Sequence, residues 1–99
     1  YCHVGTGNYN ARTARLYTDV GLLTSDRAIG NDLAQLFNSL TGYGRNVSYE
    51  RLIVAPEGMR ARVSELIRNE SDRGSDGSIT MKMNSLVDPG IIDLLYEAS

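Results

Sequence analysis

The sequence predicts an α/β fold in which mixed, largely parallel strands are flanked by helices. Residues 51–99 follow the order strand, helix, strand, helix, which favours a layout of this kind. Residues 1–44 add two β-prone runs and one segment with helical spacing. The 99 residues, of which 41% are hydrophobic, suffice for a modest core.

Residues 1–44 predict two strands and one helix. The opening β-prone run ends in the turn Gly5-Thr6-Gly7-Asn8, and a second run covers residues 20–24. A helix follows, with Thr24, Ser25 or Asp26 as its cap, because apolar residues recur along one helical face: Ile29, Leu33, Leu36, Phe37 and Leu40. Residues 41–44 end this helix, and residues 41–49 are interpreted as the connection between two units, 1–44 and 45–99.

Residues 45–99 predict two strands and two helices. Residues 51–55 form a short apolar run, and Pro56 and Glu57 stand where a helix is expected to start. Residues 78–83 alternate between polar and apolar, so Met81 and Met83 are interpreted as core residues rather than ligands. Asp88 and Pro89 should cap a final helix. The expected inner faces of the two helices are Met59, Val63, Leu66 and Ile67 in the first, and Ile91, Ile92, Leu95 and Ala98 in the second.

Size and composition narrow the functional classes. Each unit is short for an independent core, and the chain begins inside a predicted strand without Met. We therefore expect a piece of a larger protein, the end of one α/β domain joined to the start of the next. A net charge of −2 argues against general attraction to nucleic acid or membrane surfaces. No run of eighteen apolar residues is present, and a lone cysteine fits a reducing, cytoplasmic compartment.

The turn Gly5-Thr6-Gly7-Asn8 is the candidate site. It brings backbone N–H groups, a hydroxyl and an amide together at a strand end, an arrangement suited to an anion such as phosphate. It is neither a Walker loop nor a dinucleotide fingerprint, and a plain tight turn remains an alternative. Tyr17 and Asp19 alternate in the next β-prone run and are expected to face the same side. From the pattern alone this run could receive a nucleotide or be an edge strand.

Other candidates are set aside on chemical grounds. His3 has no lysine or arginine in a His-x-Lys pairing, so it is interpreted as structural rather than as a nucleophile. Asp72 and Asp76 lack the alternating ligand spacing of a calcium loop and are expected to be solvated. Whether Lys82 and Asn84, at a predicted strand end, touch substrate stays open.

The chain resembles bacterial polyphosphate kinases of the large, histidine-phosphorylating type. The resemblance runs through the whole chain and is carried by these segments: Tyr1 to Asn10, Thr13 to Asp19, Leu22 to Thr24, Leu36 to Asn38, Leu40 to Gly42, Val54 to Pro56, Met59-Arg60, Lys82 to Pro89, Leu95-Tyr96 and Ala98-Ser99. The catalytic half of that family resembles two packed phospholipase D-like domains. The resemblance therefore implies that residues 1–44 end the first such domain and residues 45–99 begin the second.

The resemblance also implies roles for particular residues. Gly5 to Asn8 match the Gly-Ser-x-Asn element of the phospholipase D-like superfamily, so Thr6 and Asn8 are expected to cradle phosphate. Tyr17 matches a tyrosine that contacts ATP, and Asp19 stands where an acid steadies a catalytic histidine. The phosphate-accepting histidine and the arginines that hold Mg²⁺ are expected upstream. The implied partners are ATP or ADP and polyphosphate, in a cytoplasmic homo-oligomer whose association with membranes is left open.

Two other functional classes are weighed against this one. A phospholipase D-like phosphodiesterase or phosphatidyltransferase shares the Gly-Thr-x-Asn element but attacks a diester. A purely structural scaffold between two half-sites is the other interpretation. The chain by itself is expected to be inactive, because the reactive histidine is not among its residues.

Overall fold

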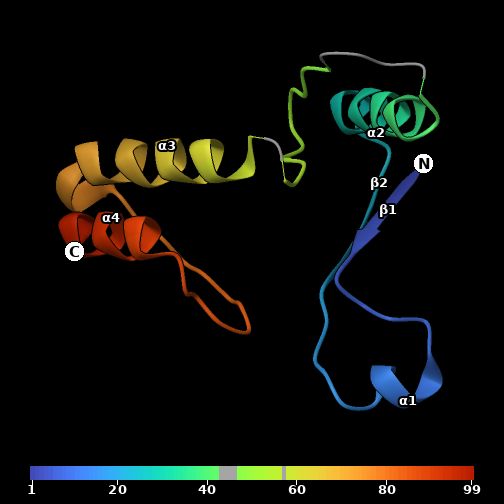
Figure 1. The fold of residues 1–99 in the computed structure, drawn as a ribbon, viewed down its shortest axis with the longest axis horizontal. Coiled ribbons are helices and arrows are strands. Elements are labelled where there is room, and N and C mark those ends of the chain that lie inside the picture. The colour runs from blue at the N-terminus through green and yellow to red at the C-terminus, as the bar shows by residue number, and fades with distance from the viewer. Residues whose placement is uncertain (43–46, 57) are drawn as a thin grey trace. The chain divides into compact units, whose positions relative to one another are not determined.

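The computed structural model describes residues 1–42, 47–56 and 58–99, which form two compact units, Tyr1–Leu52 and Ile53–Ser99. The first unit contains β1 (Cys2–Gly5), α1 (Ala11–Ala14), β2 (Gly21–Thr24) and α2 (Arg27–Leu40) (Figure 1). The second contains α3 (Met59–Asp72), the 3-10 turn η1 (Gly74–Asp76) and α4 (Pro89–Ala98). No helix among the described residues is long and apolar enough to cross a membrane.

The strands of the first unit pair antiparallel. Cys2 lies opposite Thr24 and Gly5 opposite Gly21, so β1 and β2 form a two-stranded ribbon. Both strands were predicted, but the largely parallel layout is not confirmed, since this is the one strand pair among the described residues. The sequence analysis missed α1, a single turn of helix capped by the Asn10 side chain.

Helix α2 confirms the predicted helix and one of its three candidate caps. The Asp26 carboxylate accepts the N–H of Ile29 at 2.9 Å, satisfying a donor that the first helical turn leaves unpaired. The helix ends at Leu40, as predicted. It contacts β1, where a Cβ added to Gly30 would lie 3.9 Å from the Cys2 sulfur.

In the second unit α3 packs against α4. Ile67 from α3 and Ile91 from α4 are 4% and 5% exposed and are the buried hydrophobic residues of the described chain. The predicted Asp88-Pro89 start of α4 is confirmed, because the Asp88 carboxylate accepts the N–H of Ile91 at 3.0 Å. A bidentate ion pair from Arg60 to the same carboxylate joins the first turns of the two helices.

Four predictions for the second unit are wrong. Residues 51–55 and 78–83 form neither strand nor helix, because β-prone residues need a neighbouring strand and none pairs with them. Helix α3 begins at Met59, after Gly58 in the left-handed conformation (φ 77°), rather than at Pro56 and Glu57; residue 57 lies outside the described residues. The segment predicted as a polar turn from residue 69 is helical as far as Asp72.

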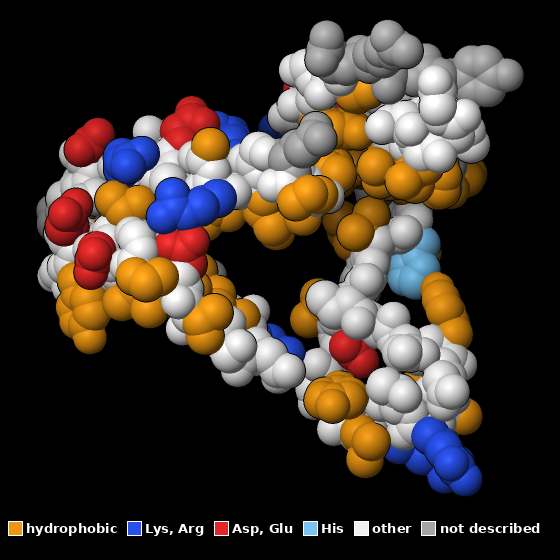
Figure 2. Space-filling model, viewed as in Figure 1, with side chains coloured by type: hydrophobic (Ala, Val, Ile, Leu, Met, Phe, Trp, Pro, Cys, Tyr) orange, Lys and Arg blue, Asp and Glu red, His pale blue; other side chains and the backbone are white. Residues whose placement is uncertain are grey.

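Many apolar side chains stay uncovered in each unit, as the sequence leads us to expect of short units. Figure 2 shows hydrophobic side chains spread over the visible surface. Met81 and Met83, predicted as core residues, are both exposed, and so are Phe37 and Leu40 of α2. Faces of this kind are normally covered by further protein.

Candidate functional site

The turn after β1 is fastened to the segment before β2 through Thr6. The Thr6 N–H donates to the Val20 carbonyl at 3.0 Å, and the Val20 N–H donates to the Thr6 hydroxyl oxygen at 3.0 Å. The hydroxyl itself donates to the Asp19 carboxylate at 2.9 Å. A threonine hydroxyl has one proton to donate, so in this structure Thr6 holds the turn in place and has no proton left for a ligand.

The Asn8 side chain has an amide donor that is not used within the turn. Its side-chain oxygen accepts the Asn10 N–H at 2.7 Å, and the Asn10 side chain in turn caps α1 by accepting the Arg12 N–H at 3.0 Å. These successive bonds are the local reason why the chain turns here. They point the Asn8 oxygen back at the backbone, and no described residue accepts a hydrogen bond from its amide nitrogen.

His3 and Tyr9 join this turn, which the sequence analysis did not foresee. The Tyr9 hydroxyl and His3 Nδ1 are 2.9 Å apart, and the two rings meet edge to face. The imidazole lies over the facing pair Gly5 and Gly21, where an added Cβ would come within 3.3 Å of Nε2 in either case. The glycine two positions after His3 was the available signal, because residues i and i+2 share a face of a strand.

Together these residues line a pocket of about 320 Å³: His3, Gly5, Gly7, Asn8, Tyr9, Asp19, Val20 and Gly21. Of the predicted site residues, the structure brings Asn8 and Asp19 into the lining and Thr6 directly behind it. Tyr17 is not in the lining; it follows α1 on a bend and is 59% exposed. The expected strand through Tyr17 and Asp19 does not form, since β2 begins at Gly21.

The charge of this pocket is negative. Asp19 is the one acidic side chain in the lining, and no lysine or arginine lines it. A phosphate group placed there would meet the Asp19 carboxylate with no lysine or arginine in the described lining to offset its charge, so this pocket lacks the positive charge that phosphoryl oxygens require. The described residues contain no group of three or more His, Cys, Asp or Glu side chains that could hold a metal ion.

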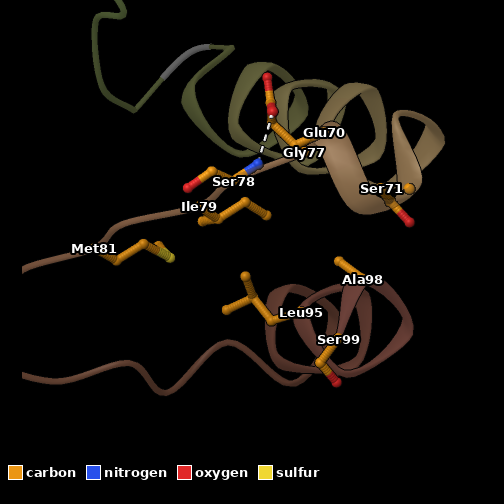
Figure 3. A pocket seen from close by; sticks show the side chains of 10 residues that line it. Glu70, Ser71, Gly77, Ser78, Ile79, Met81, Leu95, Ala98 and Ser99 are labelled. Atoms are coloured by element: carbon orange, nitrogen blue, oxygen red, sulfur yellow. Dashed lines mark hydrogen bonds between the residues drawn. The ribbon is translucent and has the colours of Figure 1, made fainter.

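A second pocket, of about 370 Å³, lies in the second unit between α3, α4 and the extended segment after η1 (Figure 3). Ile79, Met81 and Leu95 point into it, and the Glu70 carboxylate accepts the Ser78 N–H at its edge at 3.1 Å. Neither Lys82 nor Asn84 lines it. The side chains that point into this pocket are apolar, and its one acidic residue, Glu70, already accepts a hydrogen bond. The pocket therefore offers no evident phosphate site.

Comparison with known proteins assigns both halves of the chain. The family model described as "Polyphosphate kinase C-terminal domain 1" matches residues 1–46, and "Polyphosphate kinase C-terminal domain 2" matches residues 52–99. Among curated relatives, a polyphosphate kinase of Mycobacterium avium is 58% identical over 103 residues, and one of Mycobacterium marinum is 55% identical over 106 residues.

Each of these alignments covers 100% of this chain and 14% of the relative. No solved structure matches the chain significantly. The two family models nevertheless match nearly every residue, in consecutive order and without overlap. The chain therefore belongs to the polyphosphate kinase family.

Proposed function

We propose that this chain forms part of an ATP–polyphosphate phosphotransferase, which reversibly transfers the γ-phosphoryl group of ATP to polyphosphate through a phosphohistidine outside these residues. The observation that carries the proposal is the consecutive match to two polyphosphate kinase C-terminal domains. The relatives bear the name polyphosphate kinase over a sequence about seven times longer, so the chain would work as a segment of such a protein.

In this proposal Asn8 is the residue that touches phosphate. Its side-chain oxygen is bonded to the Asn10 N–H, which leaves the amide nitrogen to donate to a phosphoryl oxygen at the pocket. Thr6 serves the cradle by holding the turn, and Asp19 by accepting the Thr6 hydroxyl. A donor fixed in advance stabilises charge on the transferring group without a reorganisation cost at the moment of reaction.

The negative charge of the pocket supports a site in which this chain supplies only some of the groups and the rest of the enzyme supplies the cationic and reactive ones. Asp19 would repel a phosphate unless cations lie nearby, and the described residues that line the pocket include no lysine or arginine. We therefore place the arginines, Mg²⁺ and the reactive histidine in other parts of the enzyme. The isolated chain should then neither form phosphohistidine nor turn over ATP.

Tyr17 would contact the nucleotide, on the strength of the family resemblance. Its ring is 59% exposed and free to stack with a base. The resemblance also supports phospholipase D-like domains, in which residues 78–83 would pair with a strand; no strand among the described residues pairs with them. The alternation of polar and apolar side chains in that segment fits such an arrangement.

A chimaera tests the proposal. The matching segment of the Mycobacterium avium relative is replaced by this chain, and polyphosphate formation from ATP is followed together with acid-labile phosphohistidine. We expect turnover within about tenfold of the unmodified relative, and none from the 99 residues alone. A chimaera that folds but makes neither product would contradict the proposal, and so would activity of the isolated chain. Diester hydrolysis without phosphohistidine would point to a phospholipase D-like diesterase instead.

A further inference from the structure

Asp32 is the most deeply buried side chain of the described residues, although it carries a charge. It lies in α2, is 2% exposed, and accepts three backbone N–H groups: Glu50 at 2.9 Å, Arg51 at 2.6 Å and Leu52 at 2.8 Å. A carboxylate removed from water is stable only when its lone pairs are satisfied, and here both oxygens are used. The sequence analysis gave Asp32 no role.

Within the part of the chain that the structure describes, Asp32 is the one acceptor for these three N–H groups. Glu50, Arg51 and Leu52 belong to no helix or strand, so neither a helical nor a β-ladder partner satisfies them. Consecutive N–H groups that converge on one point form a concave anion site, and the Asp32 carboxylate fills it. This contact explains why the apolar run after Arg51 starts in a fixed position without being part of a sheet.

The bonds are selective for a charged partner. No Lys or Arg within the described residues forms an ion pair with Asp32, so its charge is balanced chiefly by the three backbone dipoles. These bonds, led by the one from Glu50, hold the pKa of Asp32 below its ordinary value. An asparagine would fill the same space but present one acceptor oxygen, and its NH₂ group would face N–H donors.

We propose that Asp32 anchors the junction between the two family domains and is thereby a positioning residue for the enzyme. The match to the first domain ends at residue 46 and the match to the second begins at residue 52, so the three bonds fall at the end of the connection. The same helix contacts β1, the strand that leads into the turn Gly5-Thr6-Gly7-Asn8. Asp32 thus fixes the last residues of the first unit to the helix that supports the candidate site.

Amide hydrogen exchange tests the anchor. In the unmodified chain, the amides of Glu50, Arg51 and Leu52 should exchange more slowly than those of an open loop. Asp32→Asn should speed their exchange at least tenfold and leave the centre of α2 within about threefold. Asp26→Asn is the matched control: it removes the same charge from the start of the same helix, and asparagine caps as well as aspartate. It should leave the three amides unchanged.

Two results would overturn the anchor. One is rapid exchange of the three amides in unmodified protein while α2 is protected, which requires no variant. The other is an Asp32→Asn protein whose junction exchanges like that of the Asp26→Asn control. If the isolated chain exchanges freely throughout, the same peptides are followed in the chimaera, where the same two results decide the matter.

The positioning role is tested by activity and rests on the proposed function. In the chimaera, Asp32→Asn should lower kcat about tenfold with the KM for ATP within twofold, while Asp32→Glu, which keeps the charge, recovers part of the loss. Unchanged kcat with a loosened junction would refute the positioning role. An inactive unmodified chimaera would instead count against the proposed function, and the exchange result would still decide the anchor.

Discussion

Asn8 provides the sharpest test of the proposed phosphate contact, because its side-chain oxygen and nitrogen would form different hydrogen bonds. The oxygen accepts the Asn10 N–H at 2.7 Å and shapes the turn, whereas the nitrogen is the donor we assign to phosphate. Asn8→Asp keeps an oxygen for the turn while it replaces the donor by a negative charge. Asn8→Ala removes both. The two variants therefore separate the shape of the turn from its chemistry.

The expected magnitude follows from one hydrogen bond to a charged group. Such bonds contribute about 1.5–3 kcal/mol, which corresponds to a loss of about 10- to 150-fold in rate. Asn8→Ala should therefore lower kcat by this factor in the chimaera and change the KM for ATP much less, since the bond is strongest to the transferring group. Asn8→Asp should cost more, because a second carboxylate joins Asp19 beside the phosphate.

Asn10→Ala is the matched control for these variants. Asn10 is the same residue type in the same turn and caps α1, but it does not line the pocket. We expect its kcat to stay within about threefold of the unmodified chimaera. The assay is initial polyphosphate formation over a range of ATP concentrations. If Asn8→Asp retained full kcat, or if Asn8→Ala acted on KM alone, Asn8 would not be a phosphate donor.

Three further predictions concern the nucleotide, pH and the core. Tyr17→Ala should raise the KM for ATP about fivefold, the equivalent of about 1 kcal/mol of stacking; an unchanged KM removes Tyr17 from the nucleotide site. The side-chain hydrogen bond from Arg60, followed by the Ile91 N–H, lowers the pKa of Asp88 from 3.8 to about 2. The ion pair therefore stabilises fully above about pH 4 and is lost as the pH falls towards 2; melting temperatures between pH 5 and 2 should fall less steeply for Asp88→Asn, and equal slopes would refute this. Ile91→Val should destabilise the second unit by about 1 kcal/mol, and Ile92→Val, at a half-buried neighbour, by clearly less; equal losses in denaturant melts would show that Ile91 is not its core.

Local signals account for the parts of the fold that could be predicted. Helices α2 and α4 each combine an apolar stripe with a capping aspartate, and both signals lie within one short stretch of sequence. The strand of residues 51–55 was predicted from a short apolar run, and that of residues 78–83 from the alternation of polar and apolar side chains. A strand also requires a partner at a distance in the sequence, which no local pattern supplies. The four-residue helix α1 was missed because one cap residue is too weak a signal.

Part of the pocket lining was selected from the sequence, but Tyr17 lies outside the lining, and His3 and Tyr9, which belong to it, were not selected. Thr6, Asn8 and Asp19 were selected for their chemistry, and the structure does bring them together. That Thr6 would give its hydroxyl proton to Asp19, thirteen residues away, depends on how β1 and β2 pair, which the sequence did not reveal. The contact between His3 and Tyr9 arises for the same reason.

The facing glycines beneath His3 restrict how this site can vary. A methyl group at Gly5 or at Gly21 would lie 3.3 Å from His3 Nε2, so the imidazole, which is bonded to the Tyr9 hydroxyl, would have to shift by a few tenths of an ångström. Neither glycine has a positive φ, so the constraint comes from the ring above them and not from the backbone. A smaller side chain at position 3 would relieve this contact, so the residue at position 3 affects which side chains positions 5 and 21 can carry.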